Sequence, residues 1–103
     1  MSVATFVAAW AAWKRSGEHG PAPQCRDHGD DILIGNCMDR LQEAEQKVLR
    51  DSGVPPEWSS WRVFDPDYIR PMREARRAAT AAGKDPDEAA RAFTRKYRKE
   101  HHL

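Results

Sequence analysis

Arginine and lysine side chains recur at helical spacing through the last third of the chain, and this pattern is typical of a surface that holds phosphates. Arginine outnumbers lysine among them, which favours bidentate recognition of phosphate or carboxylate groups. Two adjoining helices would present these cations on one face, where each neutralised phosphate adds to a salt-dependent affinity. The predicted nucleic-acid-binding residues are Arg70, Arg73, Arg76, Arg77, Arg91, Arg95, Lys96, Arg98 and Lys99.

Two other interpretations fit the same cations. Asp87 and Glu88 precede Arg91 by four and three residues, which is the arrangement of a solvated or intramolecularly paired helix face. An acidic protein surface would also match them. Residues 16–69 carry five basic and eleven acidic side chains, whereas residues 70–103 carry ten basic and five acidic ones. This asymmetry within a chain of net charge +1 bears on partners and their orientation and does not determine the fold.

Four metal-capable side chains lie within 19 residues of one another near the end of the first third of the chain. Two of them are separated by two residues, as in many zinc sites, but a second pair with this spacing is absent. The last one falls on the apolar side of a predicted helix, where a buried thiol is expected. A nucleophile and its base also need a rigid scaffold, which this Gly/Pro-rich segment does not offer. We therefore expect no catalysis and no cofactor; the zinc candidates are His19, Cys25, His28 and Cys37.

Tryptophan is abundant, with four residues in two pairs that are each spaced by three, Trp10/Trp13 and Trp58/Trp61. Such pairs place two indoles on one side of a helical turn. Either they fill a small core, or one pair projects outward as an anchor in a partner's groove. The N-terminal helix is the better candidate for an anchor because a long connector follows it and most of its sides are apolar. The predicted partner-binding residues are Phe6, Trp10 and Trp13.

Four helices are predicted to position these side chains, and no segment shows the two-residue alternation of a strand. Two starts compete for the third helix, because Pro71 lies five residues after Pro66 and would interrupt the hydrogen-bond ladder. Residues 16–30 form a long irregular connector, and residues 54–64 form an aromatic-rich linker. The fold class is an all-α small bundle with helices at about 2–15, 31–52, 66 or 71 to 82, and 86–100.

The composition fits one small helical domain over residues 1–103, either entire or with residues 1–15 as a separate docking element. An apolar share of 40% and a charged share of 32% exclude collagen-like, membrane-spanning and strongly polyionic classes. Fifteen of the apolar residues are alanine, so the core is thin, and we expect a protein partner or self-association. The apolar run 3–13 is too short to span a membrane and lacks a preceding basic segment, so we expect a cytoplasmic protein without membrane association.

The sequence therefore predicts a non-enzymatic accessory protein that contacts nucleic acid or a nucleoprotein through its arginine-rich C-terminal helix pair. The alternative is a helical adaptor or complex subunit that binds an acidic protein partner, with the N-terminal Trp/Phe helix as its anchor. The two hypotheses differ in which surface must be exposed.

Overall fold

The computed structural model describes residues 3–24 and 31–103, with side chains described over 4–24 and 38–103. This part of the chain is all-helical and contains no strand, as the sequence predicts. None of its helices is long and apolar enough to cross a membrane. All four predicted helices are present, and the segment predicted as a linker contains one additional helical turn. The elements are α1 (Val3–Arg15), α2 (Asp31–Asp51), α3 (Ser60–Val63), α4 (Pro66–Ala81) and α5 (Pro86–Glu100).

The third predicted helix, α4, begins at Pro66 and contains Pro71 in its interior. Asp65 caps its free amides, since its Oδ1 accepts a hydrogen bond from the backbone N–H of Asp67 at 2.9 Å. Pro66 occupies the first helical turn, where a missing N–H has no consequence. Pro71 has no N–H to donate to the carbonyl of Asp67, yet the helix continues past it. The two competing starts are therefore parts of one continuous helix.

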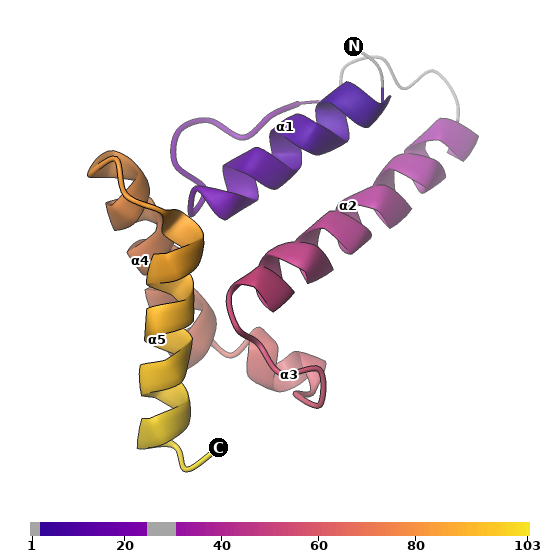
Figure 1. Cartoon of the computed structure of the whole chain (residues 1–103). Coiled ribbons are helices and arrows are strands. Elements are labelled where there is room, and N and C mark those ends of the chain that lie inside the picture. The colour runs from indigo at the N-terminus through magenta and orange to yellow at the C-terminus, as the bar shows by residue number, and fades with distance from the viewer. Residues whose placement is uncertain (1–2, 25–30) are drawn as a thin grey trace.

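The helices form two pairs that meet at one point (Figure 1). α1 and α2 pack side by side and run in the same direction, so that their C-terminal ends lie together. α4 and α5 pack as an antiparallel hairpin joined by a short turn. The C-terminal ends of α1 and α2 reach this hairpin where α5 begins. This geometry brings three helix ends against the side of α4.

The main core lies where the end of α2 meets α3, α4 and α5. The Tyr68 hydroxyl is fully buried and hydrogen-bonded to Thr94 Oγ1 at 2.8 Å, and burial raises the pKa of this phenol. Aromatic rings pack around it at centroid distances of 5.0–5.8 Å. The buried members are Leu49, Val63, Tyr68, Met72, Ala90 and Tyr97, with Val54, Trp58, Ile69 and Phe93 packed against them. This core explains how one of the four tryptophans, Trp58, is used.

The N-terminal helix α1 packs within the fold, along α2. Phe6 is only 6% exposed, so it belongs to the interior of the α1–α2 pair. The pair extends away from the main core, which gives the molecule its elongated dimensions of 47 × 31 × 18 Å (Figure 1). Because its ring is buried, Phe6 is not available to a partner's groove in this structure, and its prediction as a partner-binding residue stays untested.

The end of α1 is in backbone contact with α4 at Gly17. Gly17 has φ +82° and closes the helix, with its N–H donating to the carbonyl of Lys14 at 3.1 Å. A Cβ atom at this position would lie 2.4 Å from the carbonyl oxygen of Arg73 and 2.4 Å from the backbone nitrogen of Arg77. Only glycine allows the two helices to approach this closely.

We expect Gly17→Ala to lower the free energy of unfolding by about 3 kcal/mol or more, because a left-handed backbone costs an L-residue about 1–2 kcal/mol and the collision with α4 adds to it. Gly20→Ala is the matched control, since Gly20 has φ +83° but nothing within 4 Å of the added methyl group. The free energy of unfolding of Gly20→Ala is expected to fall only by the cost of the left-handed backbone, about 1–2 kcal/mol. Urea unfolding of both variants measures the difference, and equal losses would show that α1 does not press against α4.

Candidate nucleic-acid interface

Two of the three arginines at helical spacing on α4 bind the residues that directly follow α1. Arg73 forms an ion pair with Glu18. Arg77 donates from Nε to the carbonyl oxygen of Gly17 at 3.1 Å, although much of its side chain is exposed. Arg70 is exposed and makes no ion pair or hydrogen bond with the part of the chain that the structure describes. Two of the three predicted phosphate ligands in this row therefore attach one helix to another, as the intramolecular interpretation expects.

Arg76, the fourth arginine of α4, lies in the interior with 1% of its surface exposed. Its Nη1 donates to the carbonyl of Arg15 at 3.0 Å and to Asp87 Oδ1 at 2.7 Å. Its Nη2 donates to Ser52 Oγ at 2.6 Å and to the carbonyl of Val48 at 3.2 Å. The prediction that Arg76 belongs to an exposed phosphate-binding face is therefore wrong. Helical spacing alone groups Arg76 with the other arginines, whereas its position on the side of α4 that carries Tyr68, Met72 and Ala79 indicates burial.

Ion pairs connect Arg76, through Asp87, to the C-terminal ends of α1 and α2. Arg15 donates from Nη1 to Asp87 Oδ2 at 2.6 Å and to Asp51 Oδ2 at 3.0 Å. Lys47 donates to the same oxygen of Asp51 at 2.9 Å. Three cations and two carboxylates from four helices thus form one network, which we call the Arg76 cluster: Arg15, Lys47, Asp51, Arg76 and Asp87.

The two carboxylates of the Arg76 cluster are more acidic than ordinary aspartates. Desolvation opposes ionisation of Asp87, but the hydrogen bonds from Arg76 and Arg15 outweigh it and lower the pKa. The hydrogen bond from Lys47 is the largest influence on Asp51, and with that from Arg15 it lowers the pKa despite desolvation. The same contacts raise the pKa of the Arg15 guanidinium against the effect of its desolvation. The shifts therefore favour the charged forms of Asp51, Asp87 and Arg15.

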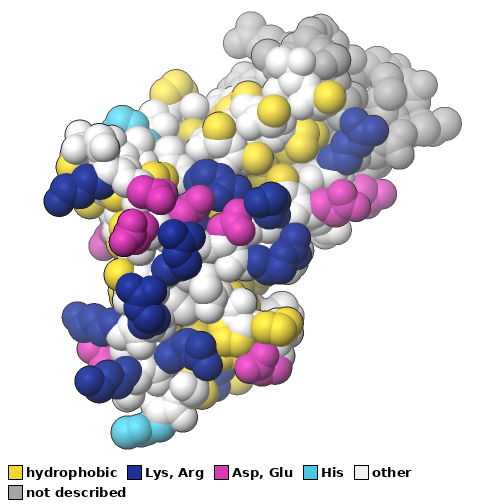
Figure 2. Space-filling model, in the orientation of Figure 1, with side chains coloured by type: hydrophobic (Ala, Val, Ile, Leu, Met, Phe, Trp, Pro, Cys, Tyr) yellow, Lys and Arg dark blue, Asp and Glu magenta, His cyan; other side chains and the backbone are white. Residues whose placement is uncertain are grey.

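The cations of α5 have a different environment. Arg95, Lys96 and Lys99 are exposed, and the side chains of Arg95 and Lys99 make no ion pair or hydrogen bond with the described residues. Lys96 lies 3.9 Å from Glu100, an exposed contact that contributes little. Figure 2 shows lysine and arginine side chains gathered along this helix. We call the following residues the α5 cations: Arg91, Arg95, Lys96, Arg98 and Lys99.

Two of the α5 cations, Arg91 and Arg98, are half-buried. Arg91 donates from Nη1 to the carbonyl of Asp51 at 3.2 Å. The Nε of Arg98 is enclosed and has no hydrogen-bond partner among the described residues. The structure thus leaves α5 as the basic surface, whereas α4 adds only Arg70 and the exposed part of Arg77. A single face shared equally by both helices is not formed.

The aromatic residues of α1 are packed, but not fully enclosed. Trp10 and Trp13 are half-buried, with the ammonium group of Lys14 at 5.3 and 5.6 Å from their ring centroids. Trp13 also donates from Nε1 to the carbonyl of Gly20 at 3.1 Å, which holds the segment after α1 against the helix. The most exposed indole belongs to the other pair and is that of Trp61, which the sequence analysis did not single out as a binding residue.

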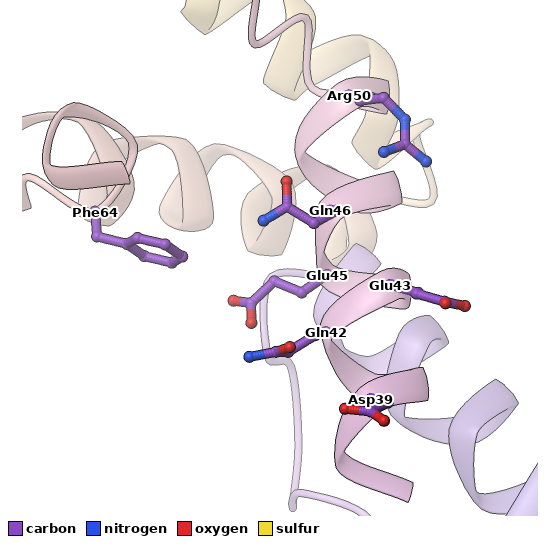
Figure 3. Close-up of a pocket in the computed structure, with 7 residues that line it drawn as sticks. All are labelled: Asp39, Gln42, Glu43, Glu45, Gln46, Arg50 and Phe64. Carbon is purple, nitrogen blue, oxygen red and sulfur yellow. The ribbon is translucent and has the colours of Figure 1, made fainter. Parts of the chain in front are cut away.

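An open hollow along the surface of α2 is bordered mainly by acidic and amide side chains. It has a volume of about 780 Å³ and is bordered by Asp39, Glu43 and Glu45 among others. Figure 3 shows Glu45 and Gln46 projecting from α2 toward the side where Phe64 lies. No group of three metal-capable side chains comes together among the described residues. This hollow repels phosphates and has no arrangement of a nucleophile, base and orienting group.

The zinc candidates fall largely outside what the structure describes. Cys25 and His28 lie outside the described residues, and so does the side chain of Cys37. His19 is exposed, and its backbone N–H donates to Ser16 Oγ at 3.1 Å. The proposed pairing of Cys25 with His28 is therefore neither supported nor contradicted.

The chain matches no protein-family model, and comparisons with curated proteins and with solved structures give no significant match. Its function is therefore inferred from the arrangement of its own residues.

We expect Arg76→Ala to lower the free energy of unfolding by about 3 kcal/mol or more, because it removes a buried cation and leaves several acceptors without donors. Arg70→Ala, on the same helix but exposed, is expected to change it by less than about 0.5 kcal/mol. Arg76→Lys should also destabilise, since one ammonium cannot replace both ends of the guanidinium. Chemical denaturation compares the three variants. Similar midpoints for Arg76→Ala and Arg70→Ala would contradict the role assigned to the cluster.

The pKa directions of Asp51 and Asp87 predict acid sensitivity. Carboxylates with a lowered pKa in the folded state stabilise it fully above their unfolded value, near 3.8, and lose this effect as the pH falls through the folded pKa. Asp87→Asn should therefore reduce stability at neutral pH and make its decline shallower below about pH 5. Thermal unfolding across this range, with Asp39→Asn as an exposed control, measures the effect. An unchanged slope in Asp87→Asn would be inconsistent with it.

Proposed function

We propose that the protein is a small non-enzymatic accessory protein that contacts nucleic-acid phosphates, alone or within a nucleoprotein, through the α5 cations. The observation that carries this proposal is the contrast between the arginines of α4 and two exposed cations of α5. Three of the four on α4 have hydrogen-bonding or ion-pairing partners inside the molecule, whereas Arg95 and Lys99 on α5 have none among the described residues. Cations without internal partners remain available for external anions.

The length of the cationic surface suits a short stretch of polynucleotide. Arg91 and Lys99 lie eight residues apart on one helix, which is about 12 Å at 1.5 Å per residue. One strand of nucleic acid places about three or four phosphates along this length at a rise of 3.4 Å. The helix is also fixed in place, because Ala90, Thr94 and Tyr97 are buried on its opposite side. Phosphate binding therefore does not require α5 to fold first.

An acidic protein partner is the competing function. The adaptor hypothesis uses Phe6, Trp10 and Trp13 as an anchor, but Phe6 is buried and both tryptophans are partly packed. Exposed carboxylates on a partner could still pair with α5, although isolated surface ion pairs contribute only about 0–1 kcal/mol each. Closely spaced phosphates give a denser row of charge, and this favours nucleic acid as the ligand.

Nucleic-acid binding by α5 predicts a strong and localised salt dependence. Each phosphate contact contributes about 0.7 to 0.9 to the slope of log K against log salt concentration, so the triple variant Arg95→Ala/Lys96→Ala/Lys99→Ala should flatten the slope by about 2. Fluorescence anisotropy with labelled DNA and RNA oligonucleotides at several salt concentrations measures this slope. The matched control is Arg40→Ala/Arg50→Ala/Lys84→Ala, which removes three exposed cations elsewhere and gives the same net charge.

The control separates a binding surface from overall charge. If both triple variants lose affinity and slope equally, the attraction is not localised on α5. If the unmodified protein binds neither nucleic acid at low salt but does bind an acidic polypeptide such as polyglutamate, the adaptor function replaces the one proposed.

A further inference from the structure

The helical turn α3 presents two exposed aromatic side chains. Trp61 is 68% exposed and Phe64, three residues later, is 47% exposed. Phe64 also borders a cleft of about 130 Å³ that Pro55 and Val63 help to line. Scattered apolar residues are common on protein surfaces, but two neighbouring large aromatic rings beside a concave surface are typical of a contact site.

A chain of ring contacts connects Trp61 to α5. The buried ring of Tyr97 on α5 lies 5.7 Å from the ring of Trp58. The guanidinium carbon of Arg62 lies 6.0 Å from the Trp58 ring centroid and 5.2 Å from that of Trp61. Because guanidinium planes stack on aromatic faces, Arg62 supports the exposed indole from the core side. Trp61 is thereby held near the C-terminal half of the cationic helix.

The two surfaces adjoin one another. Figure 2 shows hydrophobic side chains in the region of α3 next to lysine and arginine side chains over the lower part of α5. Aromatic rings on which bases stack, combined with a basic surface that follows the backbone, are the features of proteins that bind single strands. On the far side of Phe64 the acidic hollow of α2 disfavours phosphates. A strand that follows the charge therefore runs along α5 and reaches Trp61.

We propose that Trp61, supported by Arg62, is a base-stacking platform and that the nucleic acid bound by this protein is single-stranded. This inference rests on the proposed function, since it assumes that the α5 cations hold phosphates. A duplex hides the faces of its bases within the stack and presents only their edges in the grooves. An unpaired strand offers a free face to an exposed indole, and stacking is tolerant of sequence because every base has such a face.

Anisotropy titrations with a labelled oligothymidylate and with a duplex of equal length test the platform. Trp61→Ala should weaken binding of the single strand by about 5- to 150-fold, the loss expected for one stacked base, and Trp61→Phe should retain most of the affinity. Duplex binding should change less than about twofold, and the salt slope should stay constant because no charge is removed. Met38→Ala is the matched control, since it removes a side chain that is 61% exposed on α2.

The outcomes distinguish this inference from the proposed function. If the α5 triple variant loses its salt slope while Trp61→Ala binds the single strand as the unmodified protein does, the platform alone is wrong. If the unmodified protein binds neither probe at low salt, both are wrong. If Trp61→Ala leaves nucleic-acid binding intact but lowers the mass measured by light scattering, Trp61 is a self-association contact and the platform is overturned. Urea midpoints confirm that each variant is folded.

Discussion

The placement of one buried guanidinium determines how the helices of this protein meet. Burying an arginine costs several kcal/mol unless its donors find acceptors, and Nη1 and Nη2 of Arg76 find them at three helix ends. The carbonyls of Arg15 and Val48 belong to the last turns of α1 and α2, where the helix dipole is negative, and the Val48 carbonyl also accepts a hydrogen bond from the backbone N–H of Ser52. Asp87 supplies a carboxylate in the first turn of α5, where the dipole favours negative charge. The parallel arrangement of α1 and α2 follows, because both C-terminal ends must face α4.

This constraint divides the basic residues into two groups with different chemistry. Arg73, Arg76 and Arg77 on α4 are held by groups on other segments, so their charge stabilises the junction of the helices. Among the α5 cations, only Lys96 forms an ion pair with a described residue, although the molecule as a whole is almost neutral. Net charge therefore says little about binding here. Which cations are available to external anions depends on whether each one has a partner inside the molecule.

The sequence predicted the helices well because their signals are local. Apolar spacing and the Asp–Pro starts at Asp65 and Asp85 are contained within a few residues, whereas α3 is a single turn and too short for any periodicity. The burial of Arg76 could also have been predicted from the sequence, since Arg76 shares a helical side with Tyr68, Met72 and Ala79. Its partners were not, because Arg15 and Val48 lie 61 and 28 residues away along the chain. The exposure of Trp61 likewise depends on how α3 sits against α5.

Helix α5 is attached at both ends, and this bears on how tightly its surface can bind. Asp87 joins its first turn to the Arg76 cluster, while Tyr97 near its last turn packs against Trp58 and Tyr68. The exposed cations lie between these attachments and beside the second one. A ligand that binds them orders side chains but not the backbone, so little conformational entropy is lost on association. A small core is therefore enough to hold the cationic helix α5 in position, because the few large aromatic rings of the protein are concentrated against it.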